Sequence, residues 1–286
     1  MLKPKLYNFL FLNLVIMAGC TPTPFDIPPT KSLSKIPTTP APTITPEPPY
    51  WTPSMQSVFQ IQLSDYPPVI HMGADIYALD LFETTPSAIQ FLHEHDKKVI
   101  CYFNAGAWEA FRPDADKFPQ EIIGNPYVGW PGEKWLDISR YEVFSHILLK
   151  RMDLAVEKGC DGVDPDNING YMQPTGFDIT PQHQLTFNTW LSDQAHQRGL
   201  AIGMKNNGEQ ILELADHFNF AIIEDCAFHN ECEPYQVFIK KQKAVYQIEY
   251  TDRIANLRTA CDTAHALGFQ LLLKNRELDA FVQYCP

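Results

Sequence analysis

The chain has 286 residues, of which 45% are hydrophobic, and it carries a formal net charge of −12 at pH 7. Residues 51–286 are long enough for one large domain or two small ones. The excess of acidic side chains repels nucleic-acid phosphates and anionic lipid head groups. The composition therefore argues against a nucleic-acid-binding protein and favours cationic partners.

The first nineteen residues have the pattern of an export signal. Lys3 and Lys5 precede an apolar run that is too short for a comfortable bilayer span, and small residues follow before Cys20. The segment Met17-Ala18-Gly19-Cys20 resembles the lipobox of bacterial lipoproteins, which implies that residues 1–19 are a signal peptide and that Cys20 becomes acylated. The alternative is a soluble secreted protein in which Cys20 merely falls at the cleavage site.

A segment rich in proline and threonine follows, from residue 20 to residue 50. Ten of the 24 prolines lie in it, and large apolar side chains are sparse. Such a segment does not bury enough surface to fold, so we expect an extended tether between Cys20 and the domain at 51–286.

Eight short apolar or β-branched runs alternate with helix-like segments in the remaining chain. The runs span residues 57–63, 76–82, 98–104, 161–167, 200–206, 220–226, 244–250 and 269–275. At 85–96, 140–158, 180–199 and 251–268, apolar residues recur three and four positions apart, which predicts helices. The strand–helix alternation implies parallel strands, and eight such units predict a (β/α)8 barrel. An open doubly wound sheet is the alternative.

Polar side chains gather at the ends of the predicted strands, where the active sites of such barrels lie. Because strand residues alternate between two faces, Asp164 and Asp166 share a face, whereas Asp225 points away from the face of Glu224. Asp166 and Glu224 could supply the two carboxyl groups that glycoside hydrolysis needs, one as acid and one as nucleophile or base. Asp164 is a second candidate, or a like charge that raises the pKa of a neighbour.

The segment 111–139 is a long excursion after the third predicted strand. Loops of this length are often functional, and we expect it to form a wall of the cleft. Five aromatic side chains near the loops could stack on sugar rings or pack in the core: Trp108, Trp130, Trp135, Tyr171 and Tyr250.

No metal or cofactor motif is recognisable in the sequence. The stretch HEHD at 93–96 ends the first predicted helix, which places it at the opposite end of the barrel from the acids. We therefore expect no cofactor and no catalytic metal.

Six cysteines follow Cys20, an even number in a chain that we expect to be exported. We predict disulfides between Cys226 and Cys232, which are six residues apart, and between Cys261 and Cys285, which would tie the C-terminal tail to the last long helix. Cys101 and Cys160 are interpreted as buried thiols.

Several segments together resemble glycoside hydrolase family 114, the endo-α-1,4-polygalactosaminidases, from about residue 57 to the C-terminus. They include YALDLFETTPSAIQFLHEHDKKVICYFNAGAWEAFRPDADKFP, GWPGEKWLDIS, KGCDGVDPDNINGY, GLAIGMKNN and IIEDCAFHNECE. The resemblance implies a (β/α)8 barrel that cleaves α-1,4-linked galactosamine polymers of exopolysaccharide or biofilm matrix. It places the family's paired acids on Asp166 and Glu224.

With this substrate class, Glu224 is the expected general acid/base and Asp166 the expected nucleophile, and the reverse assignment stays open. De-N-acetylated galactosamine is cationic, so Asp80, Asp137 and Glu249 are candidate partners of its ammonium groups. The full set of candidate substrate-binding residues is Asp80, Tyr102, Asn104, Trp130, Asp137, Asp164, Asn167, Lys205, Asn206, Glu249, Tyr250 and Lys274.

Two other functions compete with this hypothesis. A membrane-tethered barrel that binds an aminosugar polymer without cleaving it would not need two opposed carboxylates. A lyase would need a cationic cleft, whereas these strand ends are acidic. We expect an exported, membrane-anchored or secreted monomer that acts on a cationic polysaccharide.

Overall fold

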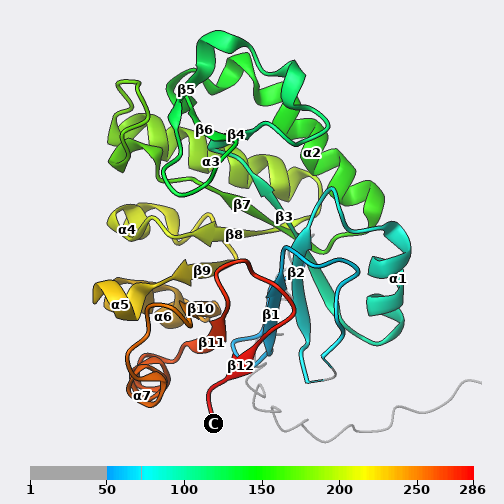
Figure 1. Ribbon diagram of the computed structural model, residues 1–286, viewed down its shortest axis with the longest axis vertical. Helices are drawn as coiled ribbons and strands as arrows, with labels where there is room; N and C mark the ends of the chain where they lie inside the picture. The colour runs from blue at the N-terminus through cyan, green and yellow to red at the C-terminus, as the bar shows by residue number, and fades with distance from the viewer. Residues whose placement is uncertain (1–49, 72) are drawn as a thin grey trace, which may run out of the picture. The chain divides into compact units, whose positions relative to one another are not determined.

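The computed structural model describes residues 50–71 and 73–286 (Figure 1). The predicted signal peptide, Cys20 and all of the predicted tether except Tyr50 lie outside the described residues. Within the described part, no helix combines the length and the apolar character needed to cross a membrane.

Eight parallel strands form the centre of the fold, and each coincides with one of the eight predicted runs. They are β1 (Phe59–Gln62), β2 (Ile76–Asp80), β3 (Lys98–Asn104), β7 (Gly162–Asp166), β8 (Ala201–Lys205), β9 (Phe220–Glu224), β10 (Val245–Tyr250) and β11 (Gln270–Lys274). Their order in the sheet follows their order in the chain, and β12 (Gln283–Tyr284) pairs antiparallel with β11. A doubly wound sheet would reverse its strand order part-way, so that alternative is wrong.

The sheet curls into a barrel, and the (β/α)8 class predicted from the sequence is confirmed. Side chains and the C-terminal segment bridge the seam between β1 and β11: Lys274 Nζ lies 3.3 Å from Gln60 Oε1, and the backbone N–H of Leu63 donates to the carbonyl of Leu278 at 2.8 Å. The described residues between β1 and β2, and those after β11, contain no helix, so two of the eight units depart from the ideal pattern.

Helices cover the outside of the barrel. The α-helices are α1 (Pro86–Glu94), α2 (Ser145–Lys158), α3 (Pro181–Gln197), α4 (Ile211–Leu214), α5 (Cys226–His229), α6 (Gln236–Lys240) and α7 (Leu257–Leu267). Of these, α1, α2, α3 and α7 lie within the four segments in which the apolar periodicity predicts helices. Short 3₁₀ helices are η1 (Ala115–Lys117), η2 (Gln120–Ile122), η3 (Ile138–Val143), η4 (Gly170–Met172), η5 (Gly208–Gln210) and η6 (Glu233–Tyr235).

Local sequence sets the ends of the longer helices. Thr85, Thr180 and Asn256 cap α1, α3 and α7 by accepting a hydrogen bond from a backbone N–H of the first turn. Gly159 and Gly268 end α2 and α7 in the left-handed conformation that glycine adopts without a steric cost.

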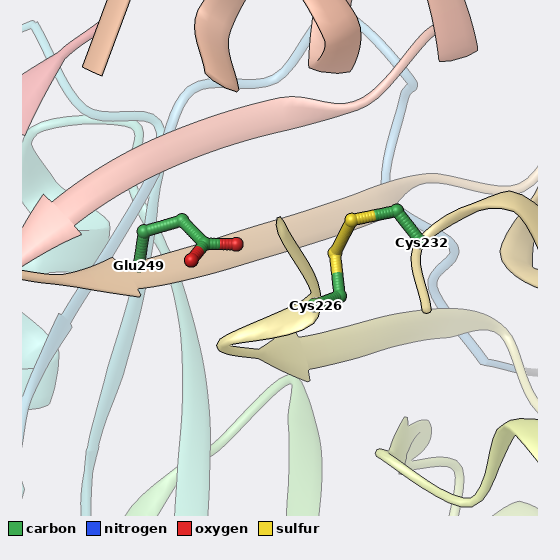
Figure 2. A group of neighbouring side chains, drawn as sticks. All are labelled: Cys226, Cys232 and Glu249. Atoms are coloured by element: carbon green, nitrogen blue, oxygen red, sulfur yellow. A yellow bond between two sulfur atoms is a disulfide. The ribbon is translucent and has the colours of Figure 1, made fainter. Parts of the chain in front are cut away.

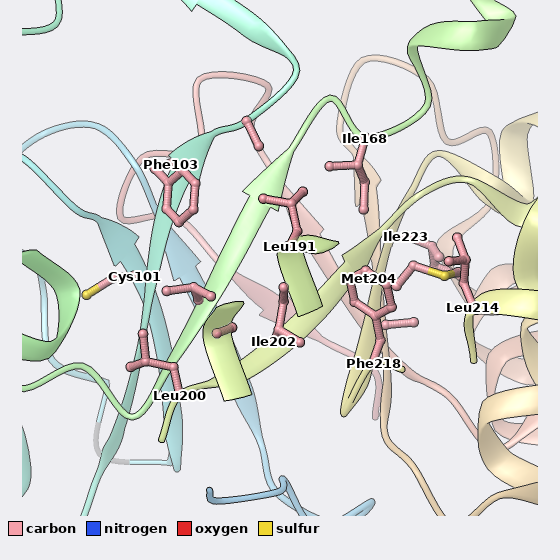
Figure 3. Close-up of a cluster of buried hydrophobic side chains, with 14 of the residues drawn as sticks. Cys101, Phe103, Ile168, Leu191, Leu200, Ile202, Met204, Leu214, Phe218 and Ile223 are labelled. Atoms are coloured by element: carbon pink, nitrogen blue, oxygen red, sulfur yellow. The ribbon is translucent and has the colours of Figure 1, made fainter. Parts of the chain in front are cut away.

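Two apolar layers hold the barrel together because strand side chains alternate between its inside and its outside. Inside, Phe59 stacks on Tyr246 with ring centroids 4.3 Å apart, and buried aliphatic side chains fill the remaining space. Outside, Phe103, Ile202 and Met204 belong to the cluster that packs with helix residues such as Leu191 (Figure 3). This alternation determines which strand-end residues face the barrel axis.

The predicted wall after β3 contains a second sheet. Strands β4 (Ala107–Glu109), β5 (Ile123–Pro126) and β6 (Glu133–Leu136) form an antiparallel sheet in the order β4-β6-β5. Because this excursion leaves the carboxyl end of β3 and returns through α2, the small sheet stands beside the face where the strands of the barrel end (Figure 1).

Three disulfides join the six cysteines of the described residues. Cys226 is bonded to Cys232 and Cys261 to Cys285, the two pairs predicted from the sequence. The prediction of buried thiols at Cys101 and Cys160 is wrong, because these two residues form the third disulfide. Cys101 points out of the barrel from β3, and Cys160 follows directly after the end of α2, so the chain brings them to one place on the outer face.

Candidate active site

A cavity of about 350 Å³ opens at the carboxyl ends of the barrel strands. Residues from the ends of β2, β3, β7, β8, β9 and β10 form its floor, and residues of the excursion between β3 and β7 form one side. Its volume lies within the range of pockets that bind small ligands.

Two carboxylates lie across a buried ammonium group in this cavity. Asp166 ends β7 and Glu224 ends β9, and Lys205 comes from the intervening strand β8. Lys205 Nζ lies 3.4 Å from Asp166 Oδ1 and 3.4 Å from Glu224 Oε2. Burial would lower the pKa of Lys205, but the charges of Asp166 and Glu224 outweigh burial and raise this pKa above its usual value. Lys205 is therefore a permanent cation between the two acids.

Hydrogen-bond donors fix the position of each acid. Tyr102 Oη donates to Asp166 Oδ2 at 2.9 Å, and the Asn167 backbone N–H donates to Asp166 Oδ1 at 2.8 Å. Tyr250 Oη donates to Glu224 Oε1. Each carboxylate thus has a phenol on one oxygen and Lys205 near the other.

Asparagines in the left-handed region shape the turns that follow β7 and β8. Asn167 has φ 60° and Asn206 has φ 51°, values that asparagine tolerates better than most residues. The Asn206 side chain bonds Glu224 twice: its Oδ1 accepts from the Glu224 backbone N–H at 3.0 Å, and its Nδ2 donates to Glu224 Oε2 at 3.4 Å. The turn after β8 therefore orients the acid on β9.

Asp164 lies one inward position below Asp166 on β7 and is fully buried. Among the described residues, neither oxygen of its carboxyl group has a hydrogen-bond partner. Burial raises the pKa of Asp164 to about 7, Lys205 opposes this rise, and Asp166 and Glu224 add to it. At neutral pH the carboxyl group of Asp164 is close to its titration midpoint.

A second buried cation, Arg112, belongs to the excursion and reaches the opposite side of the cavity. Its Nη2 lies 2.7 Å from Asp80 Oδ2 and 2.8 Å from Glu109 Oε1. The backbone N–H groups of Phe82 and Glu83 donate to the other oxygen of Asp80. These contacts join the end of β2 to the small sheet and hold the Asp80 side chain in place.

Glu133, at the start of β6, is the remaining half-buried acid of the cavity. Asn104 Nδ2 donates to Glu133 Oε2 at 3.3 Å. Burial raises the pKa of Glu133 to about 8, with further contributions from Glu109 and Asp166 and a smaller opposing effect of Arg112. At neutral pH this carboxyl group is mainly protonated.

The structure brings most of the sequence-predicted residues to this cavity. Lining residues among them are Asp80, Tyr102, Trp130, Asp166, Asn167, Lys205, Asn206, Glu224 and Tyr250. Asn104 and Asp164 lie behind the lining: Asn104 donates to Glu133, and Asp164 is buried below Asp166 on β7.

Three predicted residues lie elsewhere. Asp137 caps η3 by accepting hydrogen bonds from the backbone and hydroxyl groups of Ser139. Lys274 donates to the carbonyl of Asp279 at 2.8 Å and to Gln60 at the seam of the barrel, and burial lowers its pKa to about 8. Neither side chain lines the cavity.

Glu249 points out of β10 toward α5, away from the barrel axis (Figure 2). Its Oε1 accepts hydrogen bonds from the Ala227 backbone N–H and from Gln247 Nε2, both at 2.8 Å. Glu249, Cys226 and Cys232 form the one group of potential metal donors found in the described residues. Because the two sulfurs are bonded to each other, they have no thiolate to offer a metal, so the group fits an anchor for α5 better than a metal site.

Of the excursion residues that line the cavity, the sequence analysis predicted Trp130 and missed several others. Arg112, Tyr127 and Glu133 line the cavity, as does Arg276, whose guanidinium group lies 4.3 Å from the centroid of the Tyr250 ring. The length of the excursion indicated that it would form a wall. Its apolar residues follow no regular period, so the sequence does not indicate which of its side chains face inward.

Comparison with known proteins places this geometry in a family. The family model for glycoside hydrolase family GH114 matches residues 41–286. The chain belongs to family GH114. The resemblance inferred from the sequence motifs is therefore confirmed, and this GH114 chain is a glycosidase.

Solved structures agree with the assignment. Ega3 from Aspergillus fumigatus, determined in complex with galactosamine, is 40% identical to this GH114 protein, with a TM-score of 0.76 over 82% of this chain and 97% of Ega3. The glycoside hydrolase domain of PelA from Pseudomonas aeruginosa is 14% identical, with a TM-score of 0.63 over 80% of this chain and 98% of that domain. At this identity PelA shows a shared fold. A comparison with curated protein sequences finds no match.

Proposed function

We propose that the protein is an endo-acting hydrolase of α-1,4-linked galactosamine polymers. Membership of GH114 and the 40% identity to Ega3, whose structure contains galactosamine, support this substrate class. The observation that carries the proposal is the pair Asp166 and Glu224, held on either side of Lys205 at the carboxyl ends of the strands. Two acids in one pocket are the minimum that glycoside hydrolysis requires.

In the proposed reaction Glu224 acts as general acid/base and Asp166 as nucleophile. The Glu224 carboxylic acid gives its proton to the glycosidic oxygen while the Asp166 carboxylate bonds to the anomeric carbon, and the bond to the leaving sugar breaks. Water then attacks the same carbon, Glu224 takes its proton, and Asp166 is released. Lys205 and the two phenols keep the carboxyl groups in place through both steps.

Isosteric variants test these roles. Asp166→Asn and Glu224→Gln are each expected to lower turnover by at least about a thousandfold with an unchanged fold, because each removes one half of the mechanism. The assay is digestion of purified residues 51–286 with de-N-acetylated and acetylated galactosamine polymers, read by mass spectrometry of the oligosaccharides. Asp193→Asn, at an exposed carboxyl group on α3, is the matched control. Near wild-type turnover in either variant would move the role to another acid, with Asp164 first.

The same variants distinguish hydrolysis from binding alone. If the barrel only binds the polymer, both variants should retain their affinity for it. In that case even the wild-type protein should release no oligosaccharide. The arrangement of Asp166 and Glu224 favours hydrolysis, because a binding surface has no use for two acids fixed across one cation.

The proposed setting is the cell envelope or the exterior of the cell. Three disulfides fit an oxidising compartment, where such bonds persist. We further propose that the protein is a monomer anchored through acylated Cys20. The tether at 20–50, partly extended at about 3.1 Å per residue, would hold the barrel tens of ångströms from the bilayer.

Replacement of the acylated cysteine tests the anchor. Cys20→Ser is expected to release the protein from the membrane without changing its activity on soluble polymer, since the site is built entirely within residues 51–286. Metabolic labelling with a clickable fatty acid should mark the wild type and not the variant. Equal labelling of both proteins, or none of either, would mean that Cys20 is not the anchor.

A further inference from the structure

Most carboxylates that surround the cavity already have a cationic partner. Asp80 and Glu109 share Arg112, and Asp166 and Glu224 share Lys205. Among the lining acids that are not exposed, Glu133 differs: within the described residues, no Lys, Arg or His nitrogen lies within 4.0 Å of its carboxyl group, and the one hydrogen bond of this group comes from the neutral amide of Asn104. The cavity thus contains a carboxyl group whose cationic partner is not supplied by the described part of the chain.

Glu133 also stands where two cavities meet. It lines the catalytic cavity and a neighbouring one of about 400 Å³ on the small sheet, and Tyr127 and Trp130 line both as well. Trp108 completes the aromatic lining of the second cavity. Trp130 is 45% exposed although it is a large apolar side chain, which suits stacking on a sugar ring. A polymer that leaves the catalytic acids toward the small sheet would pass Glu133.

We infer that Glu133 binds the amino group of a galactosamine unit at this junction and thereby selects polymer with free amines over N-acetylated polymer. The inference rests on the proposed function and adds a specificity-determining residue and a second sugar-binding region, formed with Tyr127 and Trp130.

The electrostatic environment explains the selectivity. Burial, Glu109 of β4 and Asp166 of β7 disfavour a charge on Glu133, Arg112 favours it, and the phenols of Tyr102 and Tyr127 line the same cavity. An ammonium group supplies the missing positive charge, and its N–H groups donate charge-assisted hydrogen bonds to the carboxylate. An N-acetylated sugar brings no charge, so it would leave Glu133 without a cationic partner.

The experiment compares Glu133→Gln with wild type on matched de-N-acetylated and N-acetylated galactosamine oligomers. Glutamine retains the shape and can still accept the Asn104 hydrogen bond, but it carries no charge. We expect KM for the de-N-acetylated oligomer to rise about tenfold or more, with kcat changed little, and KM for the acetylated oligomer to stay the same or fall. Glu133→Asp, which keeps the charge, should restore part of the preference.

Glu121→Gln is the matched control, because Glu121 is an exposed carboxyl group of the same excursion that lines neither cavity. An unchanged ratio of the two KM values in Glu133→Gln would overturn the inference, even if both rates fell, since an indirect effect on the acids would act on both substrates alike. Cleavage of neither oligomer by the wild type would sink the proposed function, and the inference with it.

Discussion

Asp164 is the most confined acid of the site, and its titration should be visible in the stability of the protein. Its pKa is about 7 in the folded state, raised by burial from an ordinary value of 3.8. Between these two values the folded state holds a proton that the unfolded state has lost, so the contribution of Asp164 to stability is present below about pH 4 and decreases as pH rises toward 7.

Asp164→Asn removes this dependence. Between pH 5 and pH 8, the free energy of unfolding of the wild type should fall by about 3 kcal/mol relative to that of the variant, because the pH interval below the folded pKa spans about two units and each unit corresponds to about 1.4 kcal/mol. Urea unfolding of both proteins at four pH values in this range measures the difference. Parallel pH profiles would mean that Asp164 does not titrate there.

At the residue scale, strand alternation accounts for both the success and the failure of sequence-based prediction. Asp80, Tyr102 and Lys205 occupy inward positions of their strands and reach the cavity. Glu249 precedes the inward Tyr250 by one residue, so the same rule places it on the outer face, where it anchors α5. Glu133 and Arg112 were not predictable, because the excursion is irregular and its side chains follow no period that marks an inner face.

At the element scale, the two disulfides between cysteines close in the sequence were predictable, and the disulfide between distant cysteines was not. Cys226 and Cys232 are six residues apart on one connection, so few geometries are open to them. Cys101 and Cys160 are 59 residues apart, with a small sheet and α2 between them. Only the parallel pairing of β3 with β7 brings the two cysteines together, and no local sequence signal reports it.

The segment after β11 replaces the helix that an ideal eighth unit would have. The carbonyl of Leu278 accepts from the backbone N–H of Leu63, Lys274 holds the carbonyl of Asp279, and Cys285 bonds to Cys261 of α7. Arg276 and Leu278 of this segment line the catalytic cavity. One short stretch thus closes the barrel and completes the pocket, which the count of eight apolar runs could not reveal.

At the scale of the whole molecule, charge and fold act on the same substrate over different distances. The fold was predictable because the strand–helix pattern repeats along most of the chain. One ambiguous unit therefore does not change the number of predicted strands. The net charge of −12 does not contribute to the prediction of the fold. It acts at long range, where an acidic protein raises the local concentration of a cationic polymer.

Salt should weaken this attraction selectively. Raising the ionic strength from about 0.01 M to 0.15 M shortens the screening length from about 30 Å to about 8 Å, which suppresses attraction between the acidic surface and a distant polycation. We therefore expect KM for the de-N-acetylated polymer to rise several-fold over this range, with kcat nearly constant because Asp166, Lys205 and Glu224 are mostly shielded from solvent.

The fully acetylated polymer is the control, because it carries no ammonium groups and long-range attraction should not affect its KM. Steady-state kinetics on both polymers at four salt concentrations separate the contributions. An equal salt response of the two polymers would show that the charge of the protein does not recruit substrate. The salt dependence of KM for the cationic polymer is also measured in Glu133→Gln. If it disappears in this variant, the attraction lies at the junction of the two cavities, because the single pair of Glu133 and an ammonium group, and not the distributed surface charge, then accounts for the salt dependence.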